Sequence, residues 1–153
     1  MRVRIIWPGK TRDPHWRALI EEYSKRLSQF VRYEINELRE TRKADTKSGI
    51  DKDSRRISDG LQSAALVILL DPGGIQWSSE ELAAEIEQWQ NSAIKEVVFV
   101  VGGPGGVSQQ LVERANKLMS LSRLTFTHEM ARVVLLEQLY RAFTINHRLP
   151  YHK

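Results

Sequence analysis

Two short aliphatic runs, each followed by a turn rich in glycine and proline, constrain the fold of this chain more than any other feature. The longer run covers residues 64–70 and ends at the turn 71–74, and the second covers 97–101 and ends at 102–106. Both are far too short to cross a bilayer. Parallel strands that are covered on both faces have this continuous apolar pattern. We therefore expect buried parallel strands at residues 65–70 and 97–101.

Helical and strand-like patterns alternate along the whole chain. The apolar pattern predicts strands at residues 3–7, 31–38, 65–70 and 97–101, with a last short strand or ordered loop at 121–126. Helical spacing predicts helices at about 13–27, within 40–63, from Ser78 to about 91, from Ser108 onward and from His128 to Asn146. This order predicts one α/β domain over residues 1–153, an open and mainly parallel sheet with helices on both faces.

Capping residues mark three of the predicted helix starts. Asp13 precedes Pro14, a pair typical of a cap followed by proline in the first turn. Ser78 and Glu81 have the spacing of a capping box, in which each side chain bonds to the other residue's backbone N–H. Ser108 is placed to cap the helix that follows the second glycine turn.

Composition excludes several classes of protein. Without cysteine, the chain has no disulfides, no thiolate metal site and no thiol catalysis. His15, His128 and His147 have no Glu or His partner at metal-ligand spacing, so we expect no metal site. The N-terminus lacks the long apolar stretch of a signal peptide, and no segment is long enough to span a membrane. The cytoplasm is therefore the expected location.

The net charge of +4 is unevenly distributed along the chain. Residues 1–63 hold 15 Lys and Arg against 10 Asp and Glu, residues 64–110 hold one against six, and residues 111–153 hold seven against three. A cationic surface built from the two ends could attract a polyanion such as nucleic acid. An ordinary solvated surface would have the same composition.

Three loops leave the carboxyl ends of the predicted strands, where open parallel sheets bind their ligands. They are residues 71–76, residues 102–107 and the stretch after Leu121. The second loop, Gly-Gly-Pro-Gly-Gly, is neither a P-loop nor a dinucleotide fingerprint, and Pro104 removes one N–H that could bind an anion. It suits a ligand without phosphates, such as S-adenosylmethionine. A tight turn without any ligand fits the loop equally well.

The last predicted helix is apolar on nearly every side. One face carries His128, Arg132, Leu135, Leu136, Leu139 and Phe143, and the other carries Met130, Val133, Val134 and Tyr140 with Glu137 and Arg141. Such a helix is buried on more than one side, which favours a twofold homodimer over burial within one subunit. Arg132 lies in the apolar stripe and needs a strongly polar or anionic partner, either a carboxylate of the fold or an RNA phosphate.

The chain ends in Pro150, Tyr151, His152 and Lys153. Proline stops the helix, and the tip carries an aromatic ring, an imidazole and an ammonium. These groups could stack on a base, transfer a proton and hold a phosphate. A frayed, solvated terminus is the alternative.

Several motifs resemble those of a known family. Residues 99–107 (FVVGGPGGV), 120–128 (SLSRLTFTH), Arg132, 137–142 (EQLYRA) and 150–152 (PYH) are similar to the small SPOUT-class pseudouridine methyltransferases of bacterial large-subunit ribosomal RNA. The similarity covers essentially the whole chain. It implies a C-terminal trefoil knot whose loops bind S-adenosylmethionine, although knots are rare among folds. By position, the implied cofactor contacts are Leu70, Gly102, Leu121, Ser122, Arg123, Leu124, Thr125 and Phe126.

The resemblance also implies the reaction and the assembly. The expected reaction methylates the N3 position of a pseudouridine in 23S ribosomal RNA of the assembled ribosome. The expected enzyme is a homodimer, in which the cofactor pocket of one subunit and the C-terminal tail of the other form the site. Residues 71–74 vary within the family, so the resemblance assigns no role to their side chains.

The catalytic hypothesis names four residues. Arg132 and Arg141 would hold RNA phosphate or stabilise negative charge on the base, while Tyr151 and His152 would position the target or relay its proton. No residue is identified as the base, and solvent is the other proton acceptor. The alternatives are a ribosome-binding factor without catalysis, a nucleotide-binding regulator, which would need phosphate chemistry in the glycine loop, and an S-adenosylmethionine enzyme acting on protein or tRNA.

Overall fold

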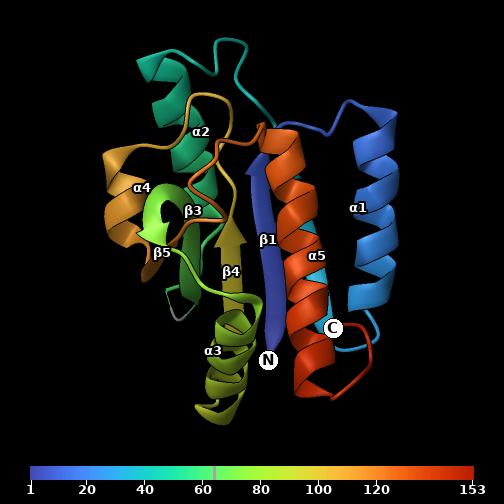
Figure 1. The fold of residues 1–153 in the computed structure, drawn as a ribbon. Coiled ribbons are helices and arrows are strands. Elements are labelled where there is room, and N and C mark those ends of the chain that lie inside the picture. The colour runs from blue at the N-terminus through green and yellow to red at the C-terminus, as the bar shows by residue number, and fades with distance from the viewer. Residues whose placement is uncertain (64) are drawn as a thin grey trace.

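The computed structural model describes residues 1–63 and 65–153, so Ala64, the first residue of the longer aliphatic run, lies outside the described part. A five-stranded sheet with the order β2-β1-β4-β3-β5 crosses the molecule, and every neighbouring pair of strands is parallel (Figure 1). The strands are β1 (Arg2–Pro8), β2 (Arg32–Leu38), β3 (Leu66–Ile75), β4 (Glu96–Val100) and β5 (Lys117–Met119). The helices are α1 (Pro14–Leu27), α2 (Lys47–Asp59), α3 (Ser79–Asn91), α4 (Gln109–Arg114) and α5 (His128–Asn146).

Helices cover both faces of the sheet, which confirms the predicted α/β architecture. Alternate residues of β4 belong to different cores: Val97 and Phe99 pack with α1, α3 and α5, whereas Val98 and Val100 pack with α2 and α4. The same division separates Ile5 from Ile6 in β1. A central strand with two buried faces needs apolar residues at every position, which explains the continuous aliphatic runs.

The capping residues behave as the sequence predicts. The Asp13 carboxylate accepts the His15 N–H at 2.8 Å, and both bonds of the Ser78–Glu81 capping box are formed. Ser108 caps α4, which ends at Arg114. The predicted bounds of α5 are confirmed, whereas α2 occupies only the later part of the predicted range 40–63 because Thr46 caps it.

The sequence-based prediction that the strand ends at Leu70 and turns at 71–74 is wrong. The strand β3 continues to Ile75, and both Leu70 and Ile75 are in register with Met119 of β5, so the residues between them form a bulge. The Asp71 carboxylate accepts the Gly73 N–H at 2.8 Å inside this bulge. A Cβ on Gly74 would lie 2.5 Å from the carbonyl carbon of Leu118, so only glycine fits there. Glycine and proline, which are typical of turns at strand ends, also occur in β-bulges.

The last strand also lies earlier in the chain than residues 121–126, for which the sequence predicted either a short strand or an ordered loop. The strand β5 is Lys117–Met119, and residues 121–126 form an ordered loop, the other form predicted for them. Three residues are too few to show the two-residue alternation of a strand. The first of them, Lys117, is polar and forms an ion pair with Glu85 at 2.7 Å. Within the loop, Ser122 accepts the Leu124 N–H at 2.9 Å.

Two further findings concern the chain as a whole. Among the residues that the structure describes, no helix is both long enough and apolar enough to cross a membrane. The trefoil knot that the family resemblance implies stays a prediction.

Candidate cofactor cavity and its surroundings

A cavity of about 310 Å³ lies at the carboxyl edge of the sheet, where the three loops after β3, β4 and β5 meet. Cavities of this size accommodate small-molecule ligands. All eight residues predicted to contact a cofactor line it, namely Leu70, Gly102, Leu121, Ser122, Arg123, Leu124, Thr125 and Phe126. The structure therefore brings together residues that are up to 56 positions apart in the sequence. The first turn of α5 closes one side with His128 and Ala131.

The glycine loop forms a wall of backbone. Gly106 has a φ of +82°, a conformation that L side chains rarely adopt, and its N–H donates to the Gly103 carbonyl at 3.0 Å. A Cβ on Gly102 would lie 3.1 Å from a methyl carbon of Val107. Small residues at these positions let the loop fold tightly and allow a ligand to approach the main chain. The titratable side chains around the cavity are Asp71, Arg123 and His128.

His128 is half-buried and lines the cavity from the first turn of α5. Burial of the imidazole, reinforced by the positive charge of Arg132, lowers the pKa of His128. The ring is therefore neutral at pH 7 and can either accept or donate a hydrogen bond.

Arg132 lies apart from the cavity, fully buried beneath the end of β1. Its guanidinium donates to the Pro8 carbonyl at 2.7 Å and to the Thr11 hydroxyl at 2.9 Å, and it lies 4.9 Å from the centre of the Trp7 ring. Burial lowers the pKa of Arg132 to about 10. Arg132 therefore has the strongly polar partner that the sequence predicts, but this partner consists of two neutral oxygens and is not a carboxylate. A fully buried side chain offers no surface to an RNA phosphate.

The other three predicted catalytic residues form one cluster, which we call the tail clamp: Arg141, Tyr151, His152 and the carboxylates of Glu137 and Glu80. Glu137 accepts from Arg141 at 2.6 Å and from the Tyr151 hydroxyl at 3.0 Å, and His152 lies 2.7 Å from Glu80. The predicted pairing of Glu137 with Arg141 is thus confirmed.

The tail clamp fixes the end of the chain against α5 (Figure 1). Burial, together with hydrogen bonds to Tyr23 and Glu137, raises the pKa of Tyr151, and Glu137 also raises the pKa of Arg141 through a hydrogen bond. None of Arg141, Tyr151 and His152 lines the cavity. The structure therefore brings these three residues together but keeps them away from the cofactor residues of their own chain.

A second, larger depression of about 1050 Å³ adjoins the cavity, and sequence reasoning did not identify it. Pro104 and His128 line both. Its other residues include Lys10, Arg12, Arg17, Arg39 and Arg42, from the loops after β1 and β2 and the start of α1. The excess of positive charge in residues 1–63 was the one sequence signal for this depression. Its cations are dispersed along the sequence, so no continuous motif marks them. In the described residues, no three His, Asp or Glu side chains are grouped to hold a metal ion.

Comparisons with known proteins find a matching family model and relatives that align over nearly the whole chain. A family model described as "Predicted SPOUT methyltransferase" matches residues 1–152. A protein of Gloeobacter violaceus named "Ribosomal RNA large subunit methyltransferase H" is 42% identical over 152 residues, which cover 99% of each chain. Proteins of the same name from Geobacter metallireducens and Christiangramia forsetii are 41% and 39% identical, again over 99% of each chain.

Proposed function

Because the chain belongs to the SPOUT methyltransferase family, we propose that it transfers a methyl group from S-adenosylmethionine to N3 of a pseudouridine in 23S ribosomal RNA of the assembled ribosome. The convergence of all eight expected cofactor residues on one cavity carries this proposal. Relatives of equal length that are named as large-subunit ribosomal RNA methyltransferases support the class of substrate. A ribosomal substrate implies that the enzyme works in the cytoplasm.

The cavity suits this methyl donor. The glycine loop offers main-chain atoms, and Leu70, Leu121 and Phe126 offer apolar surface for an adenosine. Asp71 and Arg123 offer charges of both signs for an amino acid that carries an ammonium and a carboxylate. The donor supplies a methyl group on a sulfonium that already carries its leaving group. The task of the chain is to hold donor and base in a reactive geometry.

We further propose a homodimer in which each tail completes the cavity of the partner subunit. Three residues of the tail clamp are held on their own subunit and do not line its cavity, namely Arg141, Tyr151 and His152. A dimer is the simplest arrangement in which they reach a cavity, that of the partner subunit. Leu124 in the cofactor loop and Leu149 before the tail are 75% and 44% exposed, as residues of a subunit interface would be in an isolated chain.

Roles within the composite site follow from the contacts. Tyr151 and His152 would position the base or relay its proton, and Arg141 would stabilise negative charge on it. Arg132 is a positioning residue, because its bonds to Pro8 and Thr11 fix the end of β1 against α5. The C-terminal part of the chain would form the trefoil knot of the family, which would hold the loop 121–126 in place.

Two measurements test the function. Calorimetry should show saturable heat with S-adenosylmethionine, and mass spectrometry of 23S ribosomal RNA from a strain lacking the gene should show a pseudouridine without its methyl group. Re-expression of the wild type should restore the mark. Re-expression of Gly102→Val, whose side chain would crowd Val107 and narrow the cavity, should not. If the purified protein gives neither heat nor thermal shift well above cellular donor concentrations, it is a binding factor and not this enzyme.

A further inference from the structure

The second depression is a groove with a strongly basic rim, which we call the basic groove and define by Lys10, Arg12, Arg17, Arg39 and Arg42. Its walls are the loops that follow β1 and β2, and its floor includes Leu38. Since the carboxyl ends of parallel strands share one edge of the sheet, these loops lie beside the glycine loop. Only Pro104 and His128 separate the basic groove from the cofactor cavity, because both residues line both hollows.

Most of the cationic groups in the basic groove have no ion-pair partner. Lys10, Arg12, Arg39 and Arg42 are exposed, and within residues 1–63 and 65–153 no carboxylate lies within 4.0 Å of their charged nitrogens. Arg17 likewise has no carboxylate within that distance in the described residues, but its guanidinium donates to the Thr11 carbonyl at 2.9 Å. A set of unpaired cations along one groove attracts a polyanion.

Three carboxylates line the groove, and two of them, Glu37 and Glu129, hold its backbone, while Glu40 lies beside Gly9. Glu37 accepts the Thr11 N–H at 3.1 Å and the Trp7 indole N–H at 3.3 Å. Glu129, at the start of α5, accepts the Arg12 N–H at 2.7 Å. These bonds fix the loop after β1 while the cationic ends of Lys10 and Arg12 remain free for an external partner.

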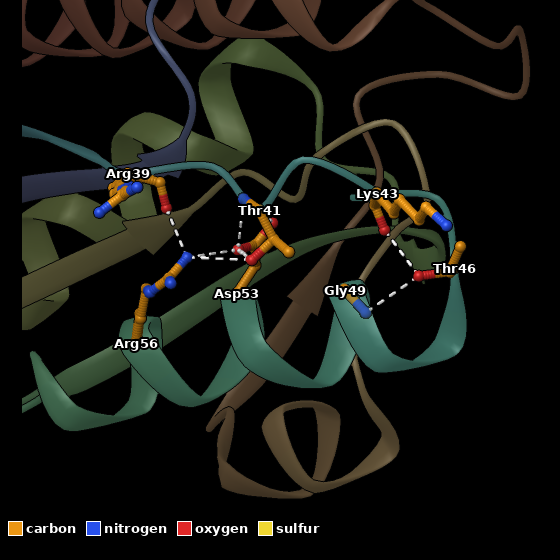
Figure 2. Close-up of polar contacts among 7 residues, drawn as sticks. All are labelled: Arg39, Thr41, Lys43, Thr46, Gly49, Asp53 and Arg56. Atoms are coloured by element: carbon orange, nitrogen blue, oxygen red, sulfur yellow. Dashed lines mark hydrogen bonds and ion pairs between the residues drawn. The ribbon is translucent and has the colours of Figure 1, made fainter.

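The loop after β2 has its own buried anchor, Asp53 of α2 (Figure 2). The Asp53 carboxylate accepts the N–H of Thr41 at 3.0 Å and its hydroxyl at 2.6 Å. Arg56 donates to Asp53 at 3.0 Å and to the Arg39 carbonyl at 2.9 Å. Asp53 is only 7% exposed, so its carboxylate is shielded from solvent, whereas the Arg56 side chain at the edge of the network is 41% exposed. This network sets the backbone from which Arg39 and Arg42 project.

The same loop packs against the wall of the cofactor cavity. A Cβ on Gly105 would lie 2.9 Å from the Ala44 carbonyl oxygen, and a Cβ on Gly49 would overlap the Lys43 carbonyl. Close approach at these two glycines fixes the basic loop against α2 on one side and the glycine loop on the other. The backbone that carries Arg39 and Arg42 is therefore held at a set position relative to the cavity, which reduces the backbone entropy lost on binding.

We propose that the basic groove binds the ribose–phosphate backbone of the RNA strand next to the target nucleotide, so that the target base enters the adjoining cavity. This inference rests on the proposed function. The unpaired cations and the shared wall at Pro104 and His128 both favour a nucleic acid that passes from one hollow into the other.

The test removes three of the unpaired cations at once. In the variant Arg12→Ala/Arg39→Ala/Arg42→Ala, affinity for large ribosomal subunits that lack the mark should fall by roughly tenfold or more at moderate salt. The slope of log affinity against log salt should become about two units shallower, at about 0.7 per lost phosphate contact. Affinity for S-adenosylmethionine should not change. The matched control Lys25→Ala/Lys52→Ala/Arg55→Ala removes three exposed cations outside the groove and should bind subunits like the wild type.

Each other outcome has a defined meaning. Normal donor binding with unchanged subunit affinity and salt slope in the groove variant would overturn the inference and leave the proposed function standing. An equal loss of affinity in the control variant would also overturn it, because the effect would then be one of net charge. Absence of donor binding in the wild type would instead count against the proposed function. A photo-crosslinking residue in place of Arg42 should label RNA, and labelling of ribosomal protein alone would overturn the inference.

Discussion

Arg132 combines a full charge with complete burial, and its neighbours explain how the fold tolerates this. The guanidinium has two neutral oxygen acceptors and lies over the Trp7 ring, an arrangement that partly replaces the lost hydration. With a pKa of about 10, the side chain stays charged at neutral pH. It joins the end of β1 to α5 and so connects the basic groove to the helix that closes the cofactor cavity.

Truncation of this residue should therefore destabilise the protein strongly. Arg132→Ala leaves a cavity and two acceptors, on Pro8 and Thr11, without their donor, so we expect the free energy of unfolding to fall by about 2–4 kcal/mol. Urea denaturation measures the change. Lys52→Ala, an exposed position on α2, should stay within about 0.5 kcal/mol of the wild type. A change at Arg132 as small as at Lys52 would contradict the structural role.

His128 should make stability depend on pH. Its pKa is lowered in the fold, so between that value and the ordinary value of 6.5 the unfolded chain binds more protons than the folded chain. Stability should fall as the pH drops from about 7 through this window and should level off below the folded pKa.

The variant His128→Gln removes this titration. Denaturation of both proteins at several values between about pH 7 and pH 5 should show that the wild type loses more stability than the variant. Parallel pH profiles would mean that His128 has no lowered pKa. His15, His147 and His152 are present in both proteins, so they do not account for a difference between the two profiles.

Local motifs predict individual site residues well only where those residues are close together in the sequence. The family resemblance, which depends on continuous motifs, implied Leu70, Gly102 and residues 121–126 as cofactor contacts, and all eight of these residues line the cavity. The partners of Arg132 were not predictable, because Pro8 and Thr11 lie more than 120 positions away in the sequence. The need for a polar partner follows from burial alone, whereas its identity depends on the tertiary fold.

Among the elements, caps and apolar runs were predictable and the β3–β5 pairing was not. Caps depend on residues within one turn, so Asp13, Ser78 and Ser108 could be identified directly. The bulge in β3 depends on the distant strand β5, which pairs with both sides of it. Its glycines and proline resemble those of a turn, since both structures need backbone shapes that ordinary residues avoid.

The loop after β2 should depend on its anchor in α2. In Asp53→Asn, the carboxylate loses one acceptor oxygen, and the bonds to Thr41 and Arg56 weaken. We expect a loss of about 1–3 kcal/mol of stability and faster cleavage by trypsin after Arg42 and Lys43. Asp51→Asn, an exposed position in the same helix, is the matched control. Equal cleavage rates in the two variants would show that Asp53 does not hold the loop.

At the scale of the whole molecule, the proposed site is divided between two places on one chain. The cavity lies at the carboxyl edge of the sheet, while the tail clamp lies farther along α5. The α5 pattern predicted burial on more than one side, and the chain itself buries residues of both faces, Leu135 and Leu139 on one and Val133 on the other. The proposed partner subunit would cover the half-buried Met130 and Val134 of the second face.

Mixed dimers test this division. Gly102→Val should inactivate the cavity, and deletion of residues 150–153 should remove the tail, so each protein alone should be inactive. Co-expressed in equal amounts, random pairing gives half mixed dimers, each with one intact site, and methylation should recover to about a quarter of the wild-type level. If the co-expressed proteins give no methylation, each site is built within a single chain.

The strand order β2-β1-β4-β3-β5 has a consequence for how the protein is made. The first strand to leave the translation machinery, β1, can join β2 early, but its other edge stays open until Glu96 and the rest of β4 emerge. The face that α1 and α3 also cover is closed by α5, which follows the other described elements in the chain. During synthesis the domain is therefore an unfinished sheet with an unprotected edge until β4 has emerged, and its core closes only when α5 is available.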